Sequence, residues 1–232
     1  PKHQLSDTPG RLSRAIPLFL AQEVCFHGCA AVRTLVPWLT GTSPAFVFSG
    51  RPWDDADAAG YARSGDTPAD YVVVTDLRTR QEPWTIELRL IRTIDARCLA
   101  TASAPLNVAQ PESGVRHITR DLLALLRVHA EYVPADPPPL YRTPTGAAFA
   151  SFLLRIEQLL AVRCSTQPGI PASFLAGTRE ILDGNLQLCL QHPDSVIVRL
   201  ILLQTFQHMN RVHADVVQEH REKLQLLRKR ST

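Results

Sequence analysis

The stretch EPWTIELRLIRTIDARCLATA, residues 82–102, decides the fold that the sequence predicts. From Trp84 to Leu90 apolar and polar side chains alternate, which is the period-two pattern of a strand with one face in water. The chain must then reverse near Asp95, because residues 97–106 again have strand character. This stretch therefore predicts an antiparallel hairpin whose polar face carries Glu87 and Arg89.

Residues 70–77, DYVVVTDL, extend this pattern toward the amino terminus. The segment is rich in β-branched residues and nearly continuously apolar, as expected of a strand buried on both faces. Residues 70–106 are therefore predicted to form three consecutive antiparallel strands.

Two longer helices are predicted to flank these strands, over residues 11–32 and 114–132, because apolar side chains recur there at helical spacing. Ser13 is placed to cap the first, with Pro17 in its opening turn. Shorter elements are expected between them: a strand at 34–39, a loop with a second apolar stretch at 45–50, and a helix over 54–65 that begins at Asp54. Asp55 and Asp57 are expected to be acidic residues of the helix start.

The order of these elements, with ADYVV at 69–73 and LRLI followed by Asp95 at 88–95, resembles the TolB amino-terminal-like domain. The resemblance covers about residues 11–132 and rests on strand alternation. It implies a bacterial, non-enzymatic α/β domain and favours a periplasmic location, with the cytoplasm as the alternative.

After a Pro-rich linker the sequence becomes helical, with apolar periodicity near residues 146–163, 172–191, 194–209 and 211–229. A helix, a Pro193-Asp194 turn and a second helix resemble the hairpins of tetratricopeptide-like arrays. We therefore predict an α+β protein with two domains. Residues 1–133 form an α/β domain with a small mixed sheet flanked by helices, 134–145 are the linker, and 146–232 form an all-α helical-hairpin domain.

The composition is that of a globular protein: 45% of the 232 residues are apolar and 20% are charged. The net charge of only +3 gives no support for nucleic acid as a partner. Five scattered cysteines do not make a disulfide framework. The apolar run near residues 15–24 is interrupted and too short for a transmembrane segment.

The clusters of residues that could bind a metal or act in catalysis are expected to have structural roles instead. Cys25 and Cys29 lie on one helical face, but their spacing is not that of a zinc site. The histidines at positions 208, 213 and 220 do not have the spacing of a metal cluster and are expected on a solvated helix face. Phosphate-binding loops and nucleophile elbows are absent from the sequence. No catalytic residue, metal or cofactor is therefore predicted.

The sequence favours a non-enzymatic adaptor or scaffold module that binds protein partners in a bacterial assembly. Two alternatives stay open: the sensory or accessory portion of a larger regulator, and an enzyme with an interdomain site that uses Cys25 or His27. Aromatic and charged side chains in predicted loops and on the polar strand face are the expected partner contacts. These are Trp53, Tyr61, Glu87, Arg89, Arg92 and Tyr141.

Overall fold

The computed structural model describes residues 7–28, 30–36, 38–39, 45–46, 53–64, 66–171 and 174–230. It divides into two compact units, Pro1–Pro138 and Pro139–Thr232. The described elements combine helices with antiparallel strands, so the fold is α+β.

The first unit is built on the predicted meander of β3 (Tyr71–Arg78), β4 (Trp84–Arg92) and β5 (Arg97–Leu106). The strands pair in the order β3-β4-β5 and both pairings are antiparallel, which confirms the three-strand prediction. The expectation of a mixed sheet is wrong for the described strands, because consecutive strands are joined by short turns that reverse the chain. Two further short strands, β1 (Trp38–Leu39) and β2 (Ala45–Phe46), pair antiparallel with each other.

The turn between β4 and β5 lacks a glycine, and the structure shows how it forms. Ala96 adopts a left-handed backbone with φ of 54°. Such a conformation costs an alanine about 1 kcal/mol. Within the same turn, Asp95 accepts hydrogen bonds from the Arg92 guanidinium and from the backbone N–H of Arg97. These contacts stabilise the reversal.

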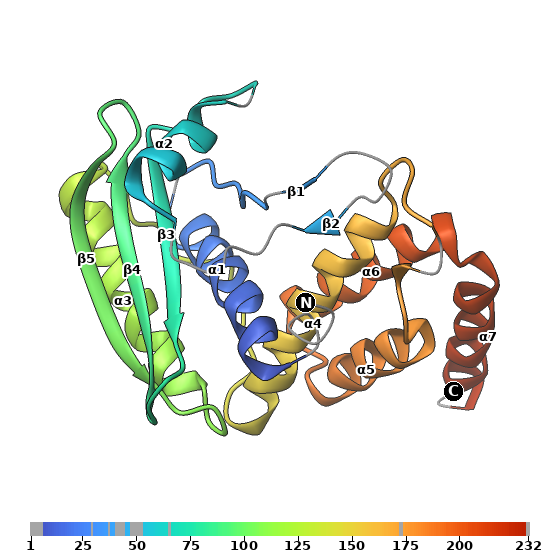
Figure 1. Ribbon diagram of the computed structural model, residues 1–232. Helices are drawn as coiled ribbons and strands as arrows, with labels where there is room; N and C mark the ends of the chain where they lie inside the picture. The colour runs from blue at the N-terminus through green and yellow to red at the C-terminus, as the bar shows by residue number, and fades with distance from the viewer. Residues whose placement is uncertain are drawn as a thin grey trace. The chain divides into compact units, whose positions relative to one another are not determined.

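Helices α1 (Thr8–Phe26) and α3 (Glu112–His129) pack against each other and against the sheet (Figure 1). They cover the side on which Ile86, Leu88 and Leu90 of β4 are fully buried. Helix α2 (Asp55–Arg63) contacts β3 and β4 on the opposite side, where Ala58 and Ala59 pack on Ile91. The sheet is therefore covered by helices on both faces.

The ends of α1 differ from the prediction. Asp7, not Ser13, caps the helix by accepting a hydrogen bond from the Gly10 N–H at 2.8 Å, and Pro17 lies inside the helix. The helix ends at Phe26, because Gly28 pairs with Pro134 in a β-bridge and lies against the Tyr132 ring. A Cβ at Gly28 would stand 2.1 Å from that ring, so a side chain does not fit at this position.

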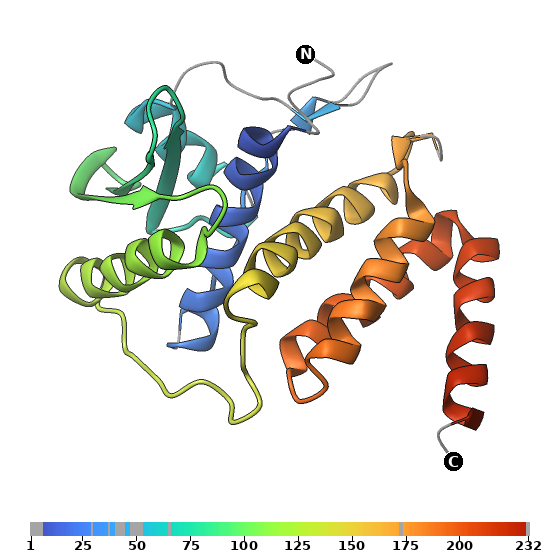
Figure 2. The ribbon, with the colours of Figure 1, turned by 90° about the horizontal axis from the view of Figure 1, so that it is seen from below.

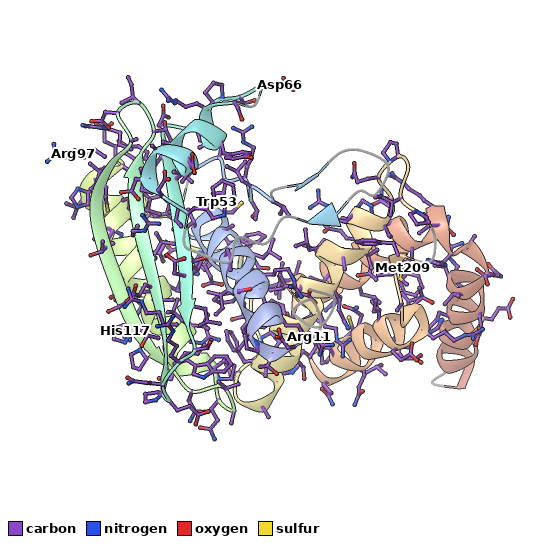
Figure 3. All side chains as sticks on the ribbon, viewed as in Figure 1. Arg11, Trp53, Asp66, Arg97, His117 and Met209 are labelled. Atoms are coloured by element: carbon purple, nitrogen blue, oxygen red, sulfur yellow. The ribbon has the colours of Figure 1, made fainter. Side chains whose placement is uncertain are left out.

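The second unit contains α4 (Ala147–Ser165), α5 (Thr178–Gln191), α6 (Val196–Val212) and α7 (Ala214–Arg230). Figure 2 shows α4, α5 and α6 packed together, with α7 against α5 and α6. Helix α5 begins later than predicted, since Gly177 takes a left-handed backbone with φ of 69° directly before it. Met209 lies in the apolar core of this unit (Figure 3). Its other buried members are Val162, Leu175, Ile181, Leu182, Val216 and Val217.

Candidate functional site

Three of the six predicted contact residues come together around α2. Trp53 lies two residues before the first residue of the helix (Figure 3), Tyr61 lies in its second half, and Arg89 reaches it from the neighbouring strand β4. Because Arg89 is more than thirty residues away in sequence, the fold itself creates this site. We call Trp53, Asp55, Tyr61 and Arg89 the α2 site.

Arg89 ties α2 to the sheet. Its guanidinium donates hydrogen bonds to the Asp55 carboxylate and to the backbone carbonyl of Trp53. Asp76 of β3 lies on the same face of the sheet, with its carboxylate 3.9 Å from the guanidinium. Arg89 is 24% exposed, and its cation has two hydrogen-bond acceptors and a second carboxylate nearby in a half-buried setting where unpaired charge is costly. The role of Arg89 is therefore to position α2, and its charge is not free for a partner.

Burial acts against the charge on Asp76. It raises the pKa of this carboxyl above its usual value, and the nearby Arg89 guanidinium partly opposes the rise. Asp76 thus depends on Arg89 for a counter-charge, and the two residues link β3, β4 and α2.

An aromatic pair forms the outer part of the α2 site. The rings of Trp53 and Tyr61 meet edge to face, with centroids 4.8 Å apart and planes at 80°. Tyr61 is 53% exposed although its ring rests on Trp53. The geometry is one that aromatic rings favour, and it fixes the tyrosine without burying it.

The remaining three predicted residues lie elsewhere. Glu87 pairs with Arg78 at 2.7 Å on the outer sheet face. Arg92 binds Asp95 in the β4–β5 turn at 2.6 Å, and this hydrogen bond lowers the pKa of Asp95 to about 2. Tyr141 belongs to the second unit and is half-buried. The structure therefore does not gather all six into one surface within either unit.

The cysteines and histidines give little support for catalysis. Burial raises the pKa of the Cys164 and Cys189 thiols to about 11, which keeps them protonated near neutral pH. Cys25 is exposed, and the His27 ring lies 3.5 Å from Glu23 on the same helix. Cys29 lies outside the described residues. In the described part of the chain, no three His, Cys, Asp or Glu side chains are grouped closely enough to hold a metal ion.

One small hollow lies between α1 and the edge strand β3. Ser13, Pro17, Thr75 and Asp76 are among its lining residues, and it has room for about one water molecule. That size does not suit a substrate. None of the helices that the structure describes combines the length and apolar character needed to span a bilayer.

Sequence reasoning missed two interactions that pair distant residues. The carboxylate of Asp55 was expected only to start a helix, yet it also holds Arg89. His220 was expected on a solvated helix face, but it is fully buried and contacts Asp183 of α5. The apolar neighbours of His220, Val216 and Val217, were the available signal that this face of α7 points inward.

Comparison of the chain with protein-family models, with curated proteins and with solved structures finds no match.

Proposed function

We propose that this chain is a non-enzymatic protein-binding adaptor or scaffold module and that the α2 site is its contact point. One observation carries the proposal: an exposed tyrosine is packed edge to face on a tryptophan, on a helix that Arg89 ties to the sheet. Aromatic side chains of this kind dominate the binding energy of many protein interfaces.

Pre-organisation adds to this argument. Association costs free energy when mobile side chains must be ordered at an interface. Trp53 holds the Tyr61 ring in place, and Ala58 and Ala59 seat the helix on Ile91. Much of the ordering cost is therefore met during folding, before a partner arrives.

The charge around the pair indicates the chemistry of the partner. Asp54 and Asp57 are exposed in the first turn of α2, and Tyr61 lies one turn after Asp57 on the same helix face. A partner surface with lysine or arginine side chains would meet both carboxylates and the faces of aromatic rings. We therefore propose a basic segment of a protein partner.

The family resemblances are part of the proposal. The order of a long helix, a three-strand antiparallel meander and an amphipathic helix supports a TolB amino-terminal-like domain. Successive packed helices from α4 to α7 support a tetratricopeptide-like region. Both would suit a module of a bacterial multi-protein assembly.

The alternatives have weaker support. An enzyme that uses Cys25 or His27 would need a nucleophile activated by a neighbouring base. Cys25 is exposed, and the described ion pair of the His27 ring is with Glu23 of the same helix, at 3.5 Å. For a sensory portion of a larger regulator, we find no specific observation in its favour. The adaptor proposal is therefore preferred.

Site-specific cross-linking tests the proposal. The full chain carries a photo-reactive phenylalanine analogue at position 61, and a matched protein carries it at the exposed position of Arg120 on α3. Each is irradiated in the cells that make the protein. We expect one discrete partner to cross-link at position 61 and not at position 120.

A second variant makes this result specific. Trp53→Ala removes the ring on which position 61 rests but keeps the backbone carbonyl that Arg89 uses. We expect the position-61 product to fall at least about tenfold, as for loss of an interface anchor. Identical products at positions 61 and 120, or a yield unchanged by Trp53→Ala, would refute the α2 site as the contact point.

A further inference from the structure

The fully buried histidine of α7 has hydrogen-bond acceptors on both sides of its ring. Nδ1 of His220 lies 2.9 Å from the backbone carbonyl oxygen of Val216. Nε2 lies 2.9 Å from a carboxylate oxygen of Asp183 on α5. The His220 side chain is 1% exposed, so its ring is shielded from water, whereas the Asp183 side chain is 58% exposed.

These two contacts identify the protonation state that the site needs. A backbone carbonyl only accepts hydrogen bonds, and so does an ionised carboxylate. A neutral imidazole carries one N–H and can satisfy one of the two acceptors, whereas the imidazolium carries two and satisfies both. The docked geometry therefore fits His220 in its cationic form, paired with Asp183.

We propose that the docking of α7 on α5 is proton-dependent, with His220 as the proton-binding residue and Asp183 as its partner. When the ring loses its proton, one ring nitrogen faces an oxygen acceptor without a hydrogen between them. Histidine is the side chain that ordinarily changes charge between about pH 5 and pH 8, and this sets the range over which the proposal is tested. Docking is strongest at the acid end and weakens as pH rises.

The His220–Asp183 pair lies where it can affect the packing of α7. Val216 and Val217, in the turn before His220, are buried in the core of the second unit with Ile181 and Leu182 of α5. A weaker His220–Asp183 pair therefore loosens the segment of α7 that closes this core. Release of α7 would expose apolar surface on α5.

A second ion pair between α5 and α7 provides a comparison. Arg179 of α5 donates two hydrogen bonds to a carboxylate oxygen of Glu219, at 3.0 and 3.1 Å. Both side chains are largely exposed, 62% and 41%. Exposed pairs contribute little stability, and an arginine keeps its charge throughout this pH range. This pair adjoins His220 but does not respond to its proton.

Other ionisable side chains lie where α5, α6 and α7 meet. Helix α5 carries Arg179, Glu180 and Asp183. Arg211 lies in the last turn of α6, and His213 lies between α6 and α7. Helix α7 carries Asp215, Glu219, Arg221 and Glu222. Among the described contacts of the His220 ring, Asp183 is the charged partner. His213 is the other imidazole close in sequence, and its Nε2 is buried without a hydrogen-bond partner in the described structure. A test must therefore separate His220 from His213.

Hydrogen exchange of the α7 backbone amides tests the proposal on the full chain. Protection of residues 217–221 is measured from pH 5.5 to pH 8 and corrected for the intrinsic effect of pH on exchange. We expect the corrected protection to fall on the order of tenfold across this range, as for loss of one hydrogen bond to a charged group.

Four variants assign the effect. His220→Gln cannot titrate, and Asp183→Asn keeps an oxygen acceptor but removes the negative charge that favours the imidazolium. Both are expected to flatten the pH dependence. Arg179→Gln and His213→Gln serve as controls and are expected to retain it. A steady wild-type protection across the range would overturn the proposal, and so would a drop that persists in both His220→Gln and Asp183→Asn.

The proposal is independent of the α2 site, which lies in the other unit. Failure of the cross-linking experiment leaves it untouched, and a pH-insensitive α7 leaves the adaptor proposal untouched. If His220→Gln does not fold, Asp183→Asn decides the outcome, because Asp183 is 58% exposed and tolerates an isosteric change.

Discussion

Helices α2 and α7 are each held to their unit by a basic side chain paired with an aspartate, but the basic side chains differ. In the first unit the Arg89 guanidinium of β4 binds Asp55 of α2. In the second unit the His220 imidazole of α7 binds Asp183 of α5. Arginine stays charged at every pH that a folded protein meets, whereas histidine does not. The Arg89–Asp55 pair of the first unit is therefore independent of pH, whereas the proposed His220–Asp183 pair of the second unit depends on it.

The apolar support of the two helices also differs. Helix α2 is short and buries three alanines, Ala58, Ala59 and Ala62. Helix α7 is longer and buries Val216 and Val217. Because an alanine side chain buries less apolar surface than a valine, α2 is seated by smaller side chains and relies more on its ion pair. The comparison predicts that removing the charge is more damaging at α2.

The largest effect is expected for Arg89→Gln. This change leaves Asp55 and the Trp53 carbonyl without their shared donor and Asp76 without its nearby counter-charge, and we expect a loss of about 2 kcal/mol in the free energy of unfolding. Urea unfolding followed by tryptophan fluorescence measures it, because all three tryptophans lie within residues 1–138. Arg78→Gln is the control: Arg78 is 71% exposed, and its pair with Glu87 should contribute under about 0.5 kcal/mol. Equal losses in the two variants would show that Arg89 has no special role.

A smaller loss is expected for Asp54→Ala. The Asp54 carboxylate caps α2 by accepting a hydrogen bond from the Asp57 N–H at 2.7 Å. Removing such a cap costs about 1 kcal/mol. Asp57→Ala keeps the backbone donor and removes only a charge from the first turn, so it should cost about half as much or less. The same fluorescence-detected unfolding compares them, and a larger loss in Asp57→Ala would contradict the assigned cap.

An increase in stability is expected for Gly60→Ala, which strengthens α2 without touching its ion pair. A Cβ at this position would meet no atom within 4 Å, and alanine favours a helix over glycine by about 0.5–1 kcal/mol. Gly28→Ala is the opposite case, because its Cβ would clash with the Tyr132 ring at 2.1 Å. Unfolding experiments should show opposite signs for the two substitutions. Destabilisation by both would mean that α2 is not packed as described.

A third ion pair, between Arg92 and Asp95 in the β4–β5 turn, is formed by a guanidinium and is exposed. Its hydrogen bond lowers the folded-state pKa of Asp95 to about 2, so the carboxylate supports folding above the unfolded-state pKa, and the support is lost as pH falls toward 2. Arg92→Gln should raise the pKa of Asp95 toward its ordinary value. Carboxyl carbon chemical shifts measured by NMR between pH 1.5 and pH 6 report it directly. An unchanged titration in Arg92→Gln would remove Arg92 as the cause.

Local patterns in the sequence were sufficient for the meander and for the α2 cap. Alternation along β4 predicted the strand and its buried face, and Asp54 marked the start of α2. The start of α1 was wrong by several residues, because Asp7 offered a capping carboxylate before the apolar periodicity began. Helix starts depend on single hydrogen bonds that periodicity does not encode.

The ion pairs could not have been predicted from one sequence. Arg89 and Asp55 are 34 residues apart, and His220 and Asp183 are 37 apart. Each pair exists only because a helix packs beside a strand or a second helix. Exposure was misjudged for the same reason: Arg89 was expected on a solvent-exposed strand face, but α2 covers that part of the sheet.

Hydrogen exchange of α2 and α7 in one sample tests the comparison most directly. After correction for the intrinsic effect of pH, we predict that protection of the α2 amides stays constant from pH 5.5 to pH 8, while protection of the α7 amides falls about tenfold. The same pH dependence in both helices, whether protection stays constant or falls, would contradict the central claim. That claim is that the basic side chain of each pair, arginine in one and histidine in the other, decides how the helix responds to pH.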